Sequence, residues 1–158
     1  MFQVSHNIQQ IIIDIKNELH TLDRFVVAQE NKYKQVIREL KAGHKTSHWI
    51  WYIFPQLEQL GKTQKAKFYG IQNIEEAREY LQHPLLNQRL RECVQILNGL
   101  ENKTAEFIFN GYPDDVKFHA CMTLFSKAAE DNEVFVQALQ KYFGGKEDKA
   151  TLALLEAE

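Results

Sequence analysis

The chain has 158 residues, of which 44% are hydrophobic and 25% charged, and its formal net charge is −2. These values are typical of an ordinary globular protein with one core, and they exclude a disordered or fibrous chain. A net negative charge also argues against a surface for duplex nucleic acid, which requires a surplus of Lys and Arg. The first apolar run, residues 11–13, is interrupted at once by Asp14 and Lys16, so we expect neither a signal peptide nor a membrane span.

Two cysteines, Cys93 and Cys121, occur in apolar surroundings without a CxxC motif or a clustered partner. This pattern favours reduced, buried thiols over a disulfide framework, and it predicts a cytoplasmic protein. Nothing in the sequence indicates a cofactor.

The first part of the chain carries apolar residues at helical spacing. This predicts one amphipathic helix over residues 5–21, capped by Ser5, and a second over residues 23–42, ended by Gly43. From His48 to Phe54 nearly every residue is apolar, which suits a buried strand and a buried helical turn equally well. We favour a buried helical or irregular segment here, ended by Pro55.

Cap signals divide the rest of the chain. Thr63 is a predicted N-cap, Asn73 with Glu76 forms a capping box, and Pro84 suits the first turn of a helix. Helices are expected over residues 63–69, 73–81, 84–98, 104–109, 114–129 and 132–143, followed by a helical tail to residue 155. No repeat or linker divides the chain. The sequence therefore predicts an all-α fold, a compact and irregular bundle of about seven to eight helices in a single domain over residues 1–158.

Residues 47–56 hold both tryptophans, and they lie in a basic stretch. Between Lys41 and Lys67 the chain has five lysines and one acidic residue, Glu58. Aromatic side chains bury large areas and tolerate one wet end, so this cluster is either the centre of a core or the wall of a ligand pocket. The sequence leaves both interpretations open.

Residues 61–63, Gly-Lys-Thr, match the end of a phosphate-binding P-loop. However, Gln56 stands where that motif requires its first glycine, so a helix C-cap followed by an N-cap explains the stretch better. Lys62 is still placed to meet an anion near the start of the next helix.

His44 and His48 are four residues apart, but the residues around them indicate a loop and no third ligand lies nearby, so no metal site is expected. Ser47 beside His48 lacks the GxSxG elbow of a hydrolase. His48 itself is either hydrogen-bonded to a neighbouring carbonyl group or acts as a proton donor or anchor for a ligand.

Asp114 and Asp115 begin a predicted helix, where capping is the main interpretation. The competing interpretation is that Asp114, Lys117 and His119 project into one cleft with His48.

Three residues near the apolar stripe of the second helix either pair locally at the surface or reach over a pocket: Arg24, Gln29 and Tyr33.

These motifs together resemble the bacterial DUF1810 family of unknown function. The resemblance rests above all on residues 47–57, Ser-His-Trp-Ile-Trp-Tyr-Ile-Phe-Pro-Gln-Leu, with further matches over residues 22–43 and 122–125. It covers residues 22–155 and leaves the helix over residues 1–21 outside. It implies a predominantly helical single domain. The family pattern before Met122 has two serines where this chain has Ala120 and Cys121. The label calpastatin, which some members carry, does not fit, because a calpain inhibitor is a long disordered chain.

Two functions of different kinds follow from the sequence. The first is a site for an anionic small molecule, such as a nucleotide or an ADP-ribose derivative, in an aromatic and basic cleft. It assigns His48 and Asp114 to proton handling, Lys45, Lys62 and Lys117 to phosphate, Tyr33, Trp49 and Trp51 to the walls, and Arg24, Gln29, Ser47, Gln56 and His119 to further contacts. It requires Lys117 and His48 to share one cleft. Whether the site is enzymatic stays open. The alternative is a protein-interaction module with the aromatic cluster as its hot spot.

Overall fold

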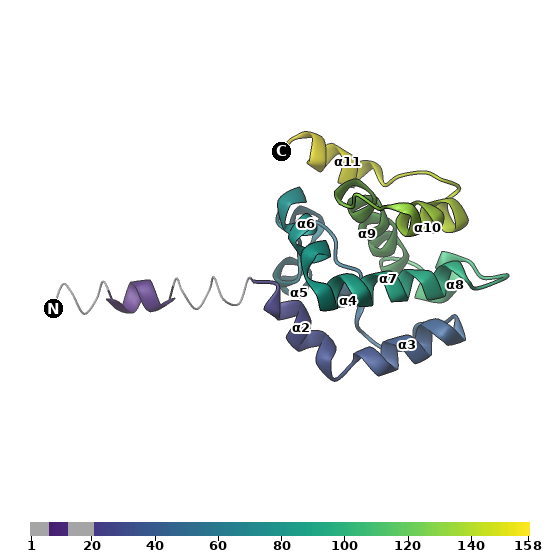
Figure 1. Cartoon of the computed structure of the whole chain (residues 1–158), viewed down its shortest axis with the longest axis horizontal. Helices are drawn as coiled ribbons and strands as arrows, with labels where there is room; N and C mark the ends of the chain where they lie inside the picture. The colour runs from purple at the N-terminus through teal and green to yellow at the C-terminus, as the bar shows by residue number, and fades with distance from the viewer. Residues whose placement is uncertain (1–6, 13–20) are drawn as a thin grey trace.

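The computed structural model describes residues 7–12 and 21–158, and the part from residue 21 onward consists of helices and loops (Figure 1). The helices in chain order are α2 (Asp23–Glu30), α3 (Tyr33–Ala42), α4 (Ile50–Ile53), the 3-10 helix η1 (Glu58–Leu60), α5 (Gln64–Phe68), α6 (Ile74–Gln82), α7 (Pro84–Asn98), α8 (Ala105–Phe109), α9 (Asp114–Ala128), α10 (Glu133–Phe143) and α11 (Lys149–Glu156). The all-α prediction is confirmed. The helix predicted over residues 5–21 lies mostly outside the described residues, and residues 7–12 of it are helical.

Eleven helices occur between residues 21 and 158, so the expected number of seven to eight was too low. One reason is that the helix predicted over residues 23–42 is two helices, α2 and α3, separated at Asn31 and Lys32. A second reason is that the buried segment after His48 contains the short helix α4, and η1 follows it. Helices of three or four residues are too short to leave a periodic pattern.

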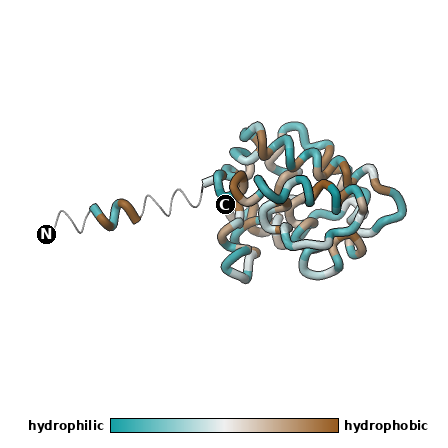
Figure 2. Tube along the Cα trace, turned by 90° about the horizontal axis from the view of Figure 1, so that it is seen from below, coloured by the Kyte–Doolittle hydropathy of each residue, from teal (hydrophilic) through white to brown (hydrophobic). Residues whose placement is uncertain are grey.

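Helix α9 lies at the centre of the helices between residues 21 and 158. It packs against α4, α6, α8, α10 and α11, and most of its residues from Phe118 to Ala128 are buried. A helix that is apolar on all sides is a core helix, and this is what the dense apolar stretch in the sequence predicted. The Phe118 ring lies 5.0 Å from the ring of Phe54, so α9 packs against the tryptophan segment as expected. Figure 2 shows hydrophobic and hydrophilic stretches alternating along much of the chain, as expected of amphipathic surface helices.

Several helices begin where the cap signals predicted. Thr63 Oγ1 accepts a hydrogen bond from Ala66 N at 3.1 Å, and Asn73 Oδ1 accepts one from Glu76 N at 2.9 Å. Pro84 occupies the first turn of α7, as predicted. Such caps satisfy amide groups that have no partner inside the helix. They therefore fix where each helix starts.

One close backbone approach joins the segment after α4 to the segment after α5. Leu57 and Ile71 form an isolated parallel bridge, in which Ile71 N donates to Gln56 O and Glu58 N donates to Ile71 O, both at 2.8 Å. Arg24 also stabilises this approach, since its Nη2 donates a hydrogen bond to Gly70 O, next to Ile71, at 2.8 Å. The bridge fixes the backbone of Gln56.

Replacing Gly70 with Ala should weaken this approach. A Cβ at position 70 would lie 2.4 Å from the Glu58 Cα atom, so the two segments would have to move apart. We expect the free energy of unfolding to fall by about 2 kcal/mol. Gly99→Ala is the control, because its new Cβ would meet only atoms at 3.6 Å. Denaturant unfolding measures both variants, and equal midpoints would contradict the role given to Gly70.

Candidate functional site

The loop after α3 is held by the carboxylate of Glu39. Gly43 ends α3 in the left-handed conformation (φ +74°), and the chain then returns past Glu39. Glu39 Oε1 accepts hydrogen bonds from Thr46 N at 2.6 Å, Ser47 N at 3.0 Å and Trp49 Nε1 at 3.0 Å. Glu39 Oε2 accepts from Ser47 Oγ at 2.5 Å and from Gln35 Nε2 at 3.1 Å. One buried carboxylate thus sets the conformation of the loop that leads into the tryptophan segment.

These hydrogen bonds also set the ionisation of Glu39. Burial alone would raise the pKa of Glu39, but the donors from Ser47, Thr46 and Trp49 outweigh it and lower this pKa to about 2. Hydrogen bonds to the charged form favour that form. Glu39 is therefore a carboxylate at neutral pH and has no proton to donate there, and both of its oxygens are occupied by the hydrogen bonds that hold the loop.

Trp49 and Trp51 have different surroundings. Trp49 is 1% exposed and belongs to the core. Trp51 is half-buried, and two lysines stand over its ring, with Lys65 Nζ at 4.6 Å and Lys117 Nζ at 5.3 Å from the ring centroid. The aromatic segment thus contributes Trp49 to the core, and its Trp51 ring contacts two lysines near the surface.

Lys45 and Asp114 form an ion pair between the loop after α3 and the start of α9, in which Lys45 is buried and Asp114 is half-buried. Their Nζ and Oδ2 atoms are 2.7 Å apart, and Lys45 is only 4% exposed. The backbone of Lys45 is also fixed, since its N donates to Ile108 O at 2.7 Å and its O accepts from Asn110 Nδ2 at 2.6 Å. Asp114 was expected to cap α9, but residue 113 is the N-cap and the Asp114 carboxylate pairs with Lys45 instead.

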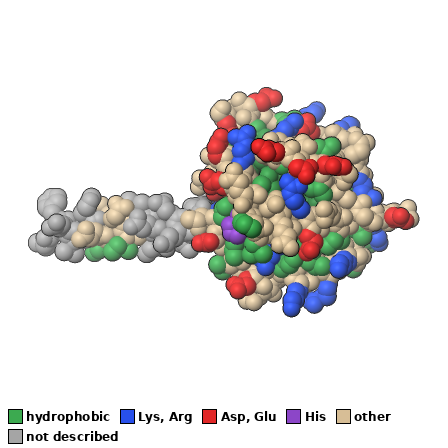
Figure 3. All heavy atoms as spheres, viewed as in Figure 1, with side chains coloured by type: hydrophobic (Ala, Val, Ile, Leu, Met, Phe, Trp, Pro, Cys, Tyr) green, Lys and Arg blue, Asp and Glu red, His purple; other side chains and the backbone are tan. Residues whose placement is uncertain are grey.

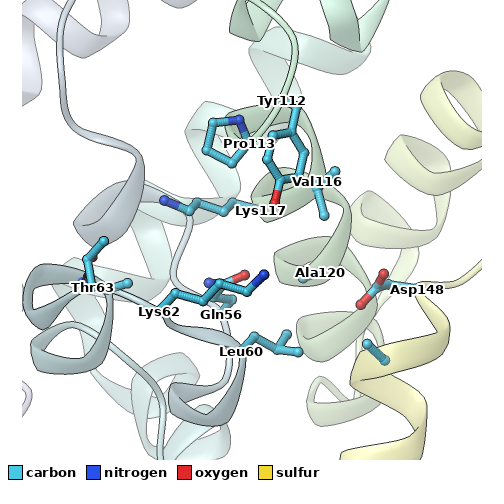
Figure 4. A pocket seen from close by; sticks show the side chains of 12 residues that line it. Gln56, Leu60, Lys62, Thr63, Tyr112, Pro113, Val116, Lys117, Ala120 and Asp148 are labelled. Atoms are coloured by element: carbon cyan, nitrogen blue, oxygen red, sulfur yellow. Dashed lines mark hydrogen bonds between the residues drawn. The ribbon is translucent and has the colours of Figure 1, made fainter.

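A cavity of about 380 Å³ opens between the segment around η1, the start of α9 and the start of α11 (Figure 4). It is lined by Gln56, Leu60, Lys62, Thr63, Ala66, Tyr112, Pro113, Val116, Lys117, Ala120, Asp148 and Ala150. Most of this lining is apolar, with a few polar side chains. Concave sites of roughly 300–1,000 Å³ with this composition are typical of small-molecule binding.

Lys117 is the half-buried cation of this cavity. Burial lowers the pKa of Lys117, the Asp114 carboxylate raises it and the Lys45 ammonium lowers it, and the net direction is downward. Lys62 extends into the same cavity from the loop before α5. Among the described residues, neither lysine has an acidic partner within ion-pair distance. The cavity therefore presents two lysines without an ion-pair partner, beside the one carboxylate of its lining, Asp148.

Gln56, Lys62 and Lys117 are the sequence-predicted site residues that line this cavity. Ser47, His48 and Trp49 line a separate pocket of about 220 Å³ together with Lys32, Gln35 and Tyr52. Lys117 and His48 are thus in different pockets, and the single cleft required by the sequence hypothesis is not found among the described residues.

The remaining sequence-predicted residues make structural contacts outside the cavity lining. Arg24 Nε donates to Phe68 O at 2.8 Å, and Gln29 Nε2 donates to Tyr52 O at 2.7 Å. Tyr33 OH donates to Glu92 Oε1 at 2.5 Å. The His119 ring stacks on Phe143 with 3.9 Å between the ring centroids, and its Nε2 lies 2.7 Å from Lys146 O.

Sequence reasoning missed several lining residues. Pro113, Val116 and Ala120 lie within one turn of Lys117, so helical spacing from Lys117 was the signal that could have found them. Tyr112, at the mouth, was seen only as part of a turn. Asp148 comes from a segment 31 residues after Lys117, and its carboxylate caps α11 by accepting from Thr151 N at 3.0 Å. No local pattern points from Asp148 to the cavity.

Other kinds of site are not found in residues 7–12 and 21–158. No three His, Cys, Asp or Glu side chains in these ranges lie close enough together to hold a metal ion. None of the helices described there has the length and apolar character needed to cross a membrane. On the face in Figure 3, acidic and basic side chains are interspersed.

The comparisons with known proteins agree with the fold. No curated protein matches the sequence. A crystal structure of the conserved hypothetical protein Rv1873 from Mycobacterium tuberculosis is similar, with 50% sequence identity and a TM-score of 0.83, over 85% of this chain and 96% of that one. The family model described as "Protein of unknown function (DUF1810)" matches residues 19–155. The helical fold, the tryptophan segment and this match together place the chain in the DUF1810 family.

Proposed function

We propose that the chain binds an anionic small molecule, of the nucleotide or ADP-ribose kind, in the cavity beside α9. The observation that carries the proposal is the pair Lys62 and Lys117, which line one concave site without an acidic partner among the described residues. A partly desolvated ammonium group attracts anions more strongly than one in open water. Lysine also binds phosphate as a point charge, without the planar geometry that arginine imposes.

The surroundings of Lys117 support this function further. Its Nζ stands over Trp51, and the buried Lys45 lies close enough to lower the pKa of Lys117. Asp114, whose carboxylate acts on the pKa of Lys117, is already paired with Lys45 at 2.7 Å. An anion in the cavity would therefore give Lys117 the ion-pair partner that the described residues do not supply.

The aromatic walls of the proposed site differ from the sequence hypothesis. Trp49 is buried in the core, and the ring of Trp51 is covered by Lys65 and Lys117. Tyr112 is 74% exposed and lines the cavity, so it is the ring available to stack on a flat ligand. Because Lys117 and His48 line different pockets, proton transfer by His48 with Asp114 has no support in this arrangement.

The alternative function, a protein-interaction module, has less support. Its hot spot would be the aromatic segment, but Trp49, Ile50 and Phe54 are each at most 1% exposed. Hot-spot side chains must be accessible in the free protein.

The proposed cytoplasmic location is supported by Cys93 and Cys121, which are both buried and free.

Thermal shift tests the proposal, because a ligand that binds only the folded state raises the unfolding midpoint. We expect nucleoside monophosphates, ADP-ribose, NAD or sugar phosphates to raise the midpoint of the wild type. Lys117→Gln should weaken binding roughly tenfold and Lys62→Gln somewhat less, because Lys62 is exposed. In the wild type, affinity should fall as pH rises through the pKa of Lys117, which lies below that of a free lysine.

The matched control is Lys34→Gln, which removes the same charge from the exposed face of α3, away from the cavity lining. It should keep the ligand-induced shift. Raising the salt concentration should reduce the shift in the wild type, since screening weakens attraction between ions. Equal shifts in Lys117→Gln and the wild type, or no shift with any compound, would overturn the proposal.

A further inference from the structure

Gln56 differs from every other buried polar residue that the structure describes. It is 9% exposed and lines the cavity, yet its side-chain amide has no hydrogen bond to another described residue. The other buried polar or charged side chains in the described ranges all have hydrogen-bond or ion-pair partners: Arg24, Gln29, Glu39, Lys45, Thr123, Ser126 and Thr151. The amide of Gln56 is open to the cavity and not sealed in the core, since the one fully buried side-chain N or O atom without a partner among the described residues is Asn98 Oδ1. Gln56 is therefore a candidate for contact with a ligand.

The backbone of Gln56 is fixed before any ligand arrives. Its carbonyl group accepts from Ile71 N at 2.8 Å in the bridge between residues 57 and 71. Its amide end lies in the middle of the lining residues, as Figure 4 shows, between the elements that carry Lys62 and Lys117. Such preorganisation lowers the entropy cost of binding.

An amide side chain has a definite recognition chemistry. It offers an N–H donor next to a C=O acceptor in one plane, and a planar partner with the reverse pattern satisfies both. Nucleobase edges present such patterns, and glutamine pairs with adenine in this two-bond manner in protein–DNA complexes. A phosphate group offers acceptors alone, so it satisfies only the donor half of the amide.

We infer that Gln56 reads the base of a nucleoside phosphate whose phosphate group is held by Lys62 and Lys117. This inference rests on the proposed function and narrows it, because it selects nucleoside phosphates over sugar phosphates and inorganic phosphate. Gln56 is then the specificity-determining residue of the cavity, while the two lysines supply attraction common to all anions.

The test compares ribose 5-phosphate with AMP, GMP, CMP and UMP, because these share the sugar and the phosphate and differ in the base. We expect at least one nucleotide to bind the wild type about tenfold or more tightly than ribose 5-phosphate, by calorimetry. In Gln56→Leu this preference should disappear while ribose 5-phosphate binds as before. Gln59→Leu, an exposed glutamine three residues on, is the matched control and should keep the preference.

The outcomes separate this inference from the proposed function. If all nucleotides and ribose 5-phosphate bind the wild type equally, the inference is overturned and the anion site stands. If none of them binds, both are overturned. A structural role for Gln56 would instead appear as a lower unfolding midpoint of ligand-free Gln56→Leu. We expect no such decrease, because the wild-type amide makes no hydrogen bond with the described residues that the variant would lose.

Discussion

Glu39→Gln is expected to lower the free energy of unfolding by about 3 kcal/mol, because it removes the charge that five donor groups share. A glutamine at position 39 also brings an NH₂ group to where the wild type has an acceptor oxygen, so at least one donor would face another donor. Urea unfolding followed by tryptophan fluorescence measures the change, since Trp49 is itself one of the partners.

The control for this variant is Glu79→Gln on the exposed side of α6, which should change stability by less than about 0.5 kcal/mol. A second signature is the pH dependence. The folded-state pKa of Glu39, about 2, lies below its ordinary value of 4.5, so its stabilising contribution is complete above pH 4.5 and is lost as pH falls toward 2. The wild type should lose about 3 kcal/mol through this group in that window. Glu39→Gln should lack that part of the slope, and an unchanged slope would contradict the account.

Asp114→Ala is the other large effect, with an expected loss of about 3–5 kcal/mol in the free energy of unfolding. The variant leaves the ammonium group of Lys45 buried at 4% exposure without its carboxylate. Breaking one half of a buried pair costs far more than exchanging both halves for apolar groups. The double variant Lys45→Met with Asp114→Leu should therefore be more stable than Asp114→Ala alone. Chemical denaturation of the three proteins measures the difference.

An exposed ion pair supplies the comparison. Lys127 and Glu147 also lie 2.7 Å apart, but their side chains are 45% and 33% exposed. Glu147→Ala should cost less than about 1 kcal/mol. If Asp114→Ala were as mild as Glu147→Ala, the burial of Lys45 would not make the Lys45–Asp114 pair important for stability.

The sequence predicted the helices best where their signals are local. Thr63, Asn73 and Pro84 mark helix starts because a cap acts over three or four residues. The break between α2 and α3 left no such trace. Phe25 and Val36 are both fully buried and lie eleven residues apart, which is close to three turns, so an unbroken helix would place them on one face as well.

The candidate site could be predicted only in part, because its residues meet through the fold. The sequence hypothesis assigned Gln56, Lys62 and Lys117 to one cleft, but it assigned His48 to that cleft as well, and His48 lines a separate pocket. The role of Asp114 was mistaken because its partner, Lys45, lies 69 residues earlier in the chain and no spacing connects them. A sequence pattern reveals mainly interactions between residues that are close in the chain, and helix capping was the role of that kind that the pattern indicated for Asp114.

A nitrogen-resolved NMR titration of the wild type with AMP shows whether this one cavity holds the ligand. The side-chain amide signals of Gln56, identified by their loss in Gln56→Leu, and the backbone signal of Lys117 report from two elements that line the cavity. We expect both to move together and to saturate with a single Kd, while the backbone signals of Ser47 and His48 in the separate pocket stay unchanged. Signals of Gln56 and Lys117 that remain still at saturating AMP would contradict it.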